Sequence, residues 1–266
     1  LQGRFIFGIS PGGLRTDAEV FGNLDRDRGA MFRESIEQVL AIWSTDAPYD
    51  LKGEFWETST RRSMDLEIGQ GVISKPFQTP YPPIMVASMS PFSESVRRAA
   101  RAGWSIVSAN FLQPVWVASH WLKLCEGWKE AGLAPEPGAW RVARSIFVAD
   151  DERTANAYAR DPHGPYGHYY ASLMRKLIGN GRPDLFKTRR EMPDAHVTHA
   201  FVMDSLVLCG TPARVAEQIL ELREQVGPFG TLVYAGHDWA DVALSRRSME
   251  LMAREVLPSV NEAIGE

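Results

Sequence analysis

The chain has 266 residues with 33 acidic and 29 basic side chains, and 44% of its residues are hydrophobic. This length and apolar content suffice for one large domain with a sizeable core and exclude a disordered chain. The small acidic excess disfavours a nucleic-acid or membrane-surface role, because both usually need a basic face.

Cysteine usage indicates a reducing compartment, and hydropathy predicts no membrane-spanning segment. Cys125 and Cys209 lie far apart and outside any CxxC motif, so neither a disulfide framework nor a structural zinc site is expected. No apolar run is long enough to cross a bilayer and no signal peptide is visible. We therefore predict a cytoplasmic protein.

The first part of the chain predicts a strand, a helix and a hairpin. The apolar run Phe5–Ser10 stops at Pro11-Gly12-Gly13, which predicts a buried strand followed by a turn. Apolar residues recur at helical spacing over Met31–Trp43, with Asp27 near the N-cap. The segment YDLKGEFWET alternates around Lys52-Gly53 and predicts a hairpin.

The middle of the chain predicts a βαβ unit. In PYPPIMVASMSPFSESVRRAARAGWSIVSAN we expect a strand over Ile84–Ala87, a helix over Ser93–Arg101 and a strand over Ser105–Ser108. Such continuous apolar strands are typical of parallel sheets covered on both faces. The pattern continues with a helix over Trp116–Ala131, a strand in WRVARSIFVAD and a helix over Glu152–Arg160.

Residues 161–201 depart from this regular pattern. They are helical in the middle of GPYGHYYASLMRKLIGNGRPDLFK and then become polar and loop-like, so we interpret them as an insertion over the main architecture. The regular pattern then resumes, with a helix from Thr211-Pro212 through Glu224, a strand in TLVYAG and a final helix over Val242–Val256.

Strands that alternate with helices along the whole chain indicate an α/β fold. Five strands are of barrel type, near Phe5, Ile84, Ser105, Val142 and Thr231. A doubly wound sheet is the alternative. The absence of GxGxxG after a strand weakens its dinucleotide-binding form.

Three blocks of sequence carry a resemblance to a known family. In chain order they are GRFIFGISPGG…DAEVFG, PPIMVASMSPFSESVRRAARAG and VLCGTPARVAEQILELREQVG. Together they resemble the bacterial luciferase-like flavin-dependent monooxygenases, and within that family the limonene and diketocamphane monooxygenase branch. The resemblance runs from Gly3 through Pro258.

The resemblance implies a (β/α)8 TIM barrel in which Phe5–Ser10 corresponds to the fourth strand. Residues 1–266 would then form a single barrel domain that lacks the first three β/α units and exposes an apolar edge. The resemblance also implies that reduced FMN and O2 oxygenate a small apolar molecule, such as a terpene or cyclic ketone. A separate flavin reductase and a homodimer are implied as partners.

Similarity to the family places contacts to the FMN phosphate in the turn ASMSPFS, at Ser88, at the backbone of Met89 and at Ser90. Backbone N–H groups before a helix, with hydroxyls nearby, suit a phosphate. The alternative is that Ser90 or Ser93 only caps the helix. Ser108 ends a neighbouring strand and is predicted to line the same cofactor cleft.

The resemblance also assigns Arg28 to the phosphate, because a guanidinium is a bidentate phosphate donor. Arg26 competes for this role, and a solvated arginine in the run DRDR is the alternative. Ser10 stands where luciferases carry a reactive cysteine, and it is a candidate catalytic residue near the flavin ring or simply a turn residue. Asn110 is a weaker candidate for the cofactor cleft.

Polar and aromatic side chains of the insertion are candidates for a substrate pocket or a proton donor: His163, His168, Tyr169 and Tyr170. We take His168 as the catalytic candidate. Packed tyrosines and exposed histidines are the alternative, and the same choice applies to His237. His196 and His199 have helix-like spacing without a third ligand, so no metal site is expected.

Three functions remain open at this stage. The first is an FMNH2-dependent monooxygenase. The second is a non-catalytic remnant that keeps flavin or partner binding, which the serine at position 10 would allow. The third is an F420-dependent oxidoreductase of the same fold.

Overall fold

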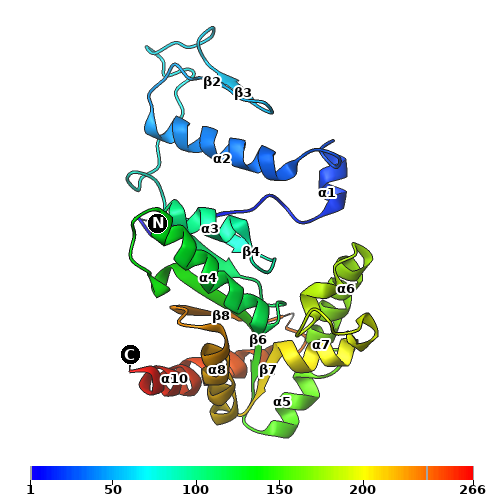
Figure 1. Ribbon diagram of the computed structural model, residues 1–266. Coiled ribbons are helices and arrows are strands. Elements are labelled where there is room, and N and C mark those ends of the chain that lie inside the picture. Colours follow the sequence, from blue (N-terminus) through cyan, green and yellow to red (C-terminus); the bar gives the residue numbers. More distant parts are fainter. Residues whose placement is uncertain (1, 238, 266) are drawn as a thin grey trace. The chain divides into compact units, whose positions relative to one another are not determined.

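The computed structural model describes residues 2–237 and 239–265. The chain divides into two compact units, unit 1 (Leu1–Met85) and unit 2 (Val86–Glu266), which Figure 1 shows from blue to red along the sequence. Within the described residues, no helix is long and apolar enough to cross a membrane.

Unit 1 is built around one long helix. Its elements are β1 (Phe7–Ile9), α1 (Arg15–Val20), α2 (Arg28–Ser44), β2 (Asp50–Lys52) and β3 (Glu57–Ser59). The predicted N-cap is confirmed, because the Asp27 side chain accepts the Ala30 N–H at 2.9 Å at the start of α2.

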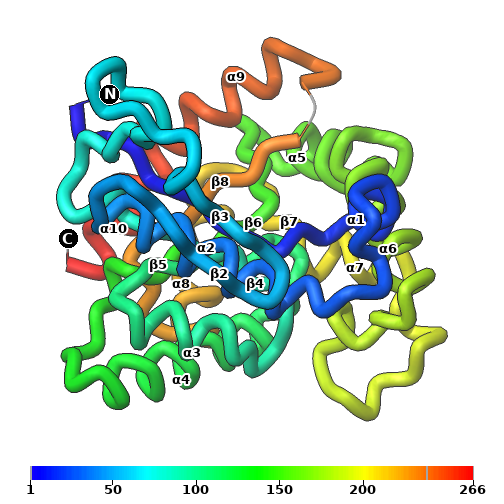
Figure 2. The backbone as a smooth tube through the Cα atoms, turned by 90° about the horizontal axis from the view of Figure 1, so that it is seen from above, coloured from blue at the N-terminus to red at the C-terminus, as the bar shows by residue number. Residues whose placement is uncertain are grey.

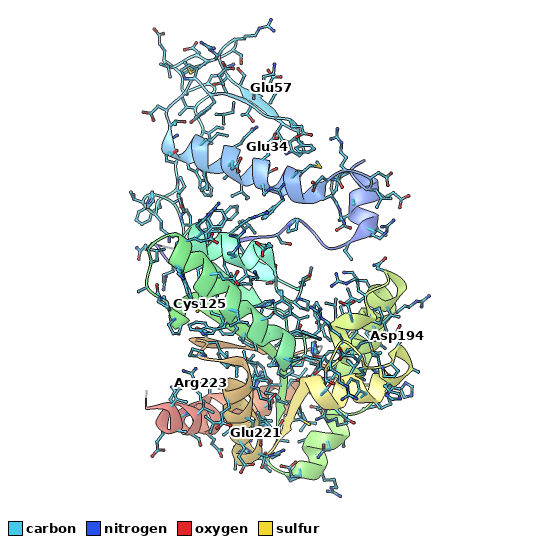
Figure 3. The ribbon with its side chains drawn as sticks, in the orientation of Figure 1. Glu34, Glu57, Cys125, Asp194, Glu221 and Arg223 are labelled. Carbon is cyan, nitrogen blue, oxygen red and sulfur yellow. The ribbon has the colours of Figure 1, made fainter. Side chains whose placement is uncertain are left out.

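The predicted hairpin is also confirmed. Strands β2 and β3 pair antiparallel, with Leu51 opposite Thr58. Glu34 of α2 points to the hairpin in Figure 3, and its carboxylate accepts the backbone N–H groups of Glu54, Phe55 and Trp56 at 2.7 to 3.1 Å. One carboxylate therefore joins the helix to the hairpin turn.

The first strand is shorter and less buried than the prediction of Phe5–Ser10. Pairing includes only Phe7–Ile9, beginning where the Phe7 N–H donates to the Pro83 carbonyl at 2.8 Å. Phe5 and Ile6 are 45% and 43% exposed. An apolar run alone does not fix how many residues find a partner strand. The helix α1 was not predicted.

Unit 2 contains most of a sheet with alternating helices, as predicted for a barrel-type α/β fold. Strand β4 (Ile84–Ser88) crosses the unit boundary, and β5 (Ser105–Ser108), β6 (Trp140–Val148), β7 (Val207–Gly210) and β8 (Thr231–Ala235) follow. Both β5 and β7 pair parallel with β6, and so does β8.

Strand β6 is the centre of this arrangement. Val142 pairs with both Ser108 of β5 and Leu232 of β8, while Ser145 pairs with both Val207 of β7 and Ala235 of β8. Since a residue has one neighbour on each side, β5 and β7 follow one another along one edge of β6 and β8 occupies the other edge.

Helices cover the outer face of the strands. Strand alternation turns Ile146 and Val148 of β6 toward a core cluster with Ile219 of α8 (Pro212–Val226) and Leu251 of α9 (Val242–Leu251). The opposite face of β6 carries Ser145.

The βαβ prediction is confirmed, with α3 (Glu94–Arg101) between β4 and β5. Helix α3 lies beside α4 (Pro114–Glu130) in both views (Figures 1 and 2). Gly127 permits this close packing, because a Cβ there would meet the Arg97 carbonyl oxygen at 2.2 Å. Before β6 the chain makes a short 3-10 turn, η1 (Pro137–Ala139).

Residues 161–201 are more regular than predicted. The expected central helix is α6 (Pro165–Gly179), preceded by α5 (Glu152–Ala159). The remainder forms two 3-10 turns, η2 (Pro183–Phe186) and η3 (Asp194–His196), and then α7 (His199–Leu206).

The final helix continues beyond its predicted end at Val256. A π-helical segment, η4 (Met252–Val256), joins α9 to α10 (Leu257–Ile264). Pro258 lies just after this π-helical segment, and Val256 and Leu257 before it keep helical backbone angles. The proline therefore does not stop the helix here.

Candidate functional site

Helix α4 contacts the turn after β4 from its buried side. Ser88 and Ser108 are 2% and 0% exposed, and their hydroxyls lie 3.2 and 2.7 Å from the two ring nitrogens of His120. Trp140 Nε1–H donates to Ser108 Oγ at 2.9 Å. Both predicted cofactor hydroxyls thus belong to a buried network.

His120 is a neutral imidazole with one defined tautomer. Burial, assisted by the Arg144 charge, lowers the pKa of His120 to about 4, against one opposing hydrogen bond. His120 Nε2 lies 2.9 Å from the Ser90 carbonyl oxygen, which can only accept. Nε2 therefore carries the proton, and Nδ1 accepts from the Ser108 hydroxyl.

The same turn presents free backbone donors on its other side. Met89 is 42% exposed and Ser90 is half-buried. Among the described residues, the N–H groups of Met89 and Ser90 donate to no other group. An anion in front of this turn would find these two donors.

The capping alternative for this turn is wrong. Ser93 occupies the N-cap position of α3, but no side-chain cap hydrogen bond forms there. Its hydroxyl lies 2.7 Å from Ser95 Oγ.

Unit 1 brings two of the predicted residues into one cavity of about 530 Å³. Ser10 and half-buried Arg28 both line it, together with Asp17 and Asn23. Asn23 Oδ1 is buried and has no hydrogen-bond partner in the described part of the chain. Arg26 is exposed and does not line the cavity.

Ser10 itself lies at the end of β1. Its Oγ accepts the Gly12 N–H at 3.2 Å, and Gly12 has a φ of 77°, which favours glycine. Ser10 therefore acts as a turn residue. Because it also lines the cavity, it could contact a cofactor as well.

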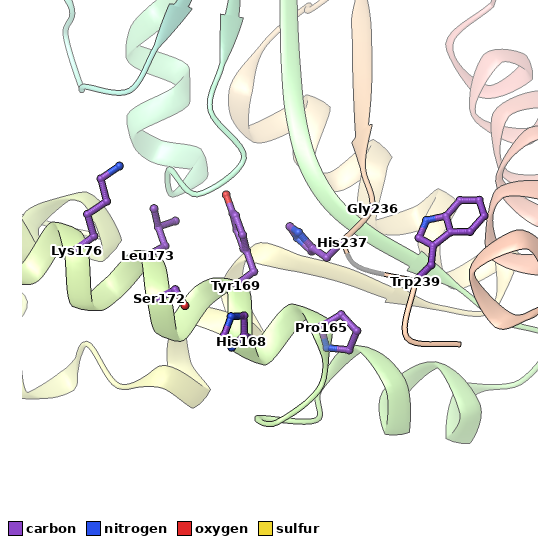
Figure 4. Close-up of a pocket in the computed structure, with 9 residues that line it drawn as sticks. All are labelled: Pro165, His168, Tyr169, Ser172, Leu173, Lys176, Gly236, His237 and Trp239. Carbon is purple, nitrogen blue, oxygen red and sulfur yellow. The ribbon is translucent and has the colours of Figure 1, made fainter. Parts of the chain in front are cut away.

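Unit 2 contains a second cavity, of about 690 Å³, beside helix α6. Figure 4 shows the side chains that line it, and Tyr169, Leu173 and Lys176 project from one side of α6 toward it. His237 and Trp239, which follow β8, line its other side. Aromatic and apolar walls with few polar groups are typical of a small-molecule site.

A polar network reaches this cavity through Tyr169 and His237. Ser145 Oγ accepts from Asn110 Nδ2 at 3.0 Å and lies 2.9 Å from both the Tyr170 hydroxyl and His237 Nε2. Tyr169 donates to Asn110 Oδ1 at 2.9 Å, and its ring stacks on His237 at 4.1 Å. Burial raises the pKa of Tyr170, so its hydroxyl stays protonated.

The hydrogen bonds from Ser145 to Tyr170 and His237 can take two donor–acceptor arrangements. Because Asn110 uses one acceptor site of Ser145 Oγ, the serine donates to either Tyr170 or His237 and accepts from the other. His237 Nε2 can therefore either accept the Ser145 hydroxyl proton or donate a proton to Ser145 Oγ.

The two other histidines of the predicted cluster lie nearer the surface. His168 is exposed at the rim of the cavity, and in Figure 4 it points away from Tyr169 and His237. His163 is exposed as well, while Tyr170 is fully buried. The structure thus brings Tyr169, Tyr170 and Asn110 together with His237 rather than with His168.

Sequence reasoning did not single out His120, Ser119 or Ser145. One signal was present: strand alternation puts Ser88 on the same face as Ile84 and Val86, which are buried under helices. A polar side chain on that face needs a buried partner. His237 had a second signal, its place just after the strand TLVYAG.

Comparisons with known proteins agree with this architecture. The family model of luciferase-like monooxygenases matches residues 1–228. The chain is 27% identical to 3,6-diketocamphane 1,6-monooxygenase of Pseudomonas putida, over 98% of this chain and 73% of the relative. It is 26% identical to limonene 1,2-monooxygenase of Rhodococcus erythropolis, over 99% and 63%.

The solved structures give the same picture. The oxygenating constituent of 3,6-diketocamphane monooxygenase from Pseudomonas putida, in complex with FMN, superposes with a TM-score of 0.82 at 27% identity, covering 97% of this chain and 72% of that one. An F420-dependent secondary alcohol dehydrogenase shares the fold at 19% identity, with a TM-score of 0.60 over 96% and 68% of the two chains.

Proposed function

We propose that this protein uses reduced FMN and O2 to oxygenate a small apolar molecule of the terpene or cyclic-ketone type. The chain belongs to the luciferase-like monooxygenase family. The observation that carries this proposal is the cavity beside α6, whose aromatic wall includes His237, the partner of buried Ser145. The resemblance deduced from the sequence is confirmed at the level of the family.

Each unit, taken by itself, offers groups that suit part of a flavin. In unit 2, Met89 and Ser90 offer backbone N–H donors that suit a phosphate. In the cavity of unit 1, Arg28 offers a guanidinium, which suits a phosphate as well. The buried acceptor Asn23 Oδ1 suits a ring N–H. When bound, reduced flavin would supply the electrons that activate O2.

The phosphate contacts that we propose differ in kind among the predicted residues. In unit 2, Met89 and Ser90 would act through their backbone. For unit 1, the resemblance proposes Arg28, which would act through its side chain. Ser88 and Ser108, whose hydroxyls contact His120, would support the turn from behind. Ser10 would lie beside the cofactor from its place in the cavity of unit 1.

At the substrate, the chain would exclude water and hold a proton. Tyr169, Leu173 and Trp239 form apolar walls that suit a hydrophobic ring system. His237 would deliver or accept a proton at an oxygen of the substrate, with Ser145 and Tyr170 adjusting behind it. His168 would assist at the rim.

We further propose a separate flavin reductase, a cytoplasmic location and a homodimer. The 3,6-diketocamphane enzyme is described as an oxygenating constituent, which supports a partner that supplies reduced flavin. Cys125 and Cys209 are unpaired, as a reducing compartment requires.

The test is turnover under ¹⁸O2 with chemically reduced FMN and a panel of bicyclic ketones and terpenes. We expect one ¹⁸O atom in the product, detected by mass spectrometry. Flavin binding without turnover on any substrate would favour the non-catalytic remnant. Turnover with reduced F420 and not with reduced FMN would favour the oxidoreductase and overturn the monooxygenase.

A further inference from the structure

Two adjacent buried residues of helix α4 form hydrogen bonds to the turn after β4. Ser119 and His120 are 3% and 0% exposed. His120 Nε2–H donates to the Ser90 carbonyl at 2.9 Å, and Ser119 Oγ accepts the Phe92 N–H at 2.8 Å. The two contacts lie on either side of Pro91.

The turn has a backbone conformation that is unfavourable for its residues in isolation. Phe92 has a φ of 50°, in the left-handed region that costs a residue with a Cβ about 1 kcal/mol or more. Ser119 holds this conformation through the Phe92 N–H, and its own hydroxyl donates to the Trp116 carbonyl. Strain of this kind often shapes a binding loop.

His120 also anchors both ends of the segment that carries the N–H groups of Met89 and Ser90, because it contacts the Ser88 hydroxyl before them and the Ser90 carbonyl after them. Because the Ser90 carbonyl points to His120, it is withdrawn from the exposed side of the turn. Ser108 and Trp140 lock the imidazole in turn, so the ring cannot rotate away. The N–H groups of Met89 and Ser90 are left available to an anion.

We infer that Ser119 and His120 are positioning residues for phosphate recognition, holding the turn so that its N–H groups meet the phosphate of the cofactor. This inference rests on the proposed function and assigns part of its cofactor selectivity to a helix that lies beneath the site. Neither side chain would touch the phosphate itself.

The experiment compares dissociation constants for reduced FMN and reduced riboflavin, which lacks the phosphate, by anaerobic fluorescence titration. We expect the wild-type protein to prefer FMN. Ser119→Ala and His120→Leu should weaken FMN binding roughly tenfold and leave riboflavin binding nearly unchanged. His120→Gln keeps an N–H donor and should recover part of the preference.

Ser248→Ala is the matched control. Ser248 is also a fully buried helix serine, and its Oγ accepts the Val148 N–H at 2.8 Å, far along the chain from the turn. The variant should lose comparable stability but keep the ratio of the two constants. If His120→Leu does not fold, Ser119→Ala and His120→Gln carry the comparison.

An unchanged ratio in Ser119→Ala, or an equal change in Ser248→Ala, would overturn the inference and leave the proposed function standing. A wild-type protein that binds both flavins equally would overturn it too. A wild-type protein that binds neither flavin would overturn the proposed function, and the inference with it.

Discussion

His120 makes the stability of the protein depend on pH in a defined window. Its pKa falls from 6.5 to about 4 on folding, mainly because of burial. His120 is therefore protonated below pH 6.5 in the unfolded chain, but only below about pH 4 in the folded protein. The free energy of unfolding should fall by about 1.4 kcal/mol per pH unit across this window, about 3 kcal/mol in all.

Urea denaturation at pH 7, 6 and 5 measures this dependence. His120→Gln, which does not titrate, should show a flatter profile between pH 6.5 and 5. The carboxyl groups Glu94, Asp150 and Asp151 have lowered pKa values, so their loss of stability begins at lower pH. Parallel profiles for the two proteins would contradict the prediction.

Arg144 is a buried charge with an incomplete set of partners. It is 1% exposed, Nη1 donates to the Ala143 carbonyl at 3.1 Å, and Nη2 has no partner among the described residues. Burial lowers the pKa of Arg144 to about 10. Arg144→Met should therefore raise the free energy of unfolding by about 1–3 kcal/mol at pH 7, as measured in urea. A loss of stability would refute this.

Two histidines border the cavity beside α6, and paired variants separate their roles. His237→Gln should lower kcat about a hundredfold, because His237 joins the Ser145 network, and should leave KM within a few-fold. His168→Gln should cause a smaller loss, since its exposed side chain lies at the rim. A larger loss in His168→Gln would support His168, the residue predicted from the sequence, as the catalytic residue. Steady-state kinetics with reduced FMN provides both constants.

At the scale of an element, the hairpin of unit 1 depends on a residue outside it. Glu34 accepts three consecutive backbone N–H groups of the hairpin turn, and a Cβ on Gly53 would meet Glu34 Oε1 at 2.1 Å. Glu34→Ala should destabilise the hairpin by about 1–3 kcal/mol, seen as faster hydrogen exchange at residues 54–56. Exposed Glu37 on the same helix provides the control, and Glu37→Ala should leave those amides unchanged. Equal exchange rates in both variants would exclude this role.

Some elements follow directly from local sequence, and others do not. Asp27 caps α2 as predicted, because capping needs only one side chain and the N–H groups next to it. The extension through Pro258 could not be read from the sequence, since it depends on a π-helical segment that sequence periodicity does not reveal. The buried orientation of Ser88 required strand alternation, and its partner His120 is 32 residues away.

For the molecule as a whole, the family and fold type were predictable, while the site was only partly so. The parallel strands and the barrel-type alternation are confirmed. The description of residues 1–266 as one domain with an insertion at 161–201 stays a prediction. Ser10 and Arg28 do share a cavity. At the second cavity, the lining residue His237 contacts Ser145, which lies 92 residues earlier in the chain. Such a pairing depends on strand register, which sequence periodicity does not encode.

Cofactor binding should stabilise the whole protein by mass action. Reduced FMN at a hundred times its dissociation constant should raise the free energy of unfolding by about 2.7 kcal/mol. Thermal denaturation under anaerobic conditions measures the shift, with reduced riboflavin at the same concentration as the comparison. The absence of any shift at saturating FMN would argue against flavin binding to the folded state.

The double pairing of Ser145, to Val207 on one side and Ala235 on the other, has a consequence for engineering the cavity beside α6. The hydroxyl stands in the interior of a hydrogen-bonded ladder, so its coordinates are dictated by backbone pairing and not by a loop that can be lengthened or exchanged. Loop grafting around the aromatic walls should thus alter which molecules enter while leaving the Ser145 hydroxyl in place.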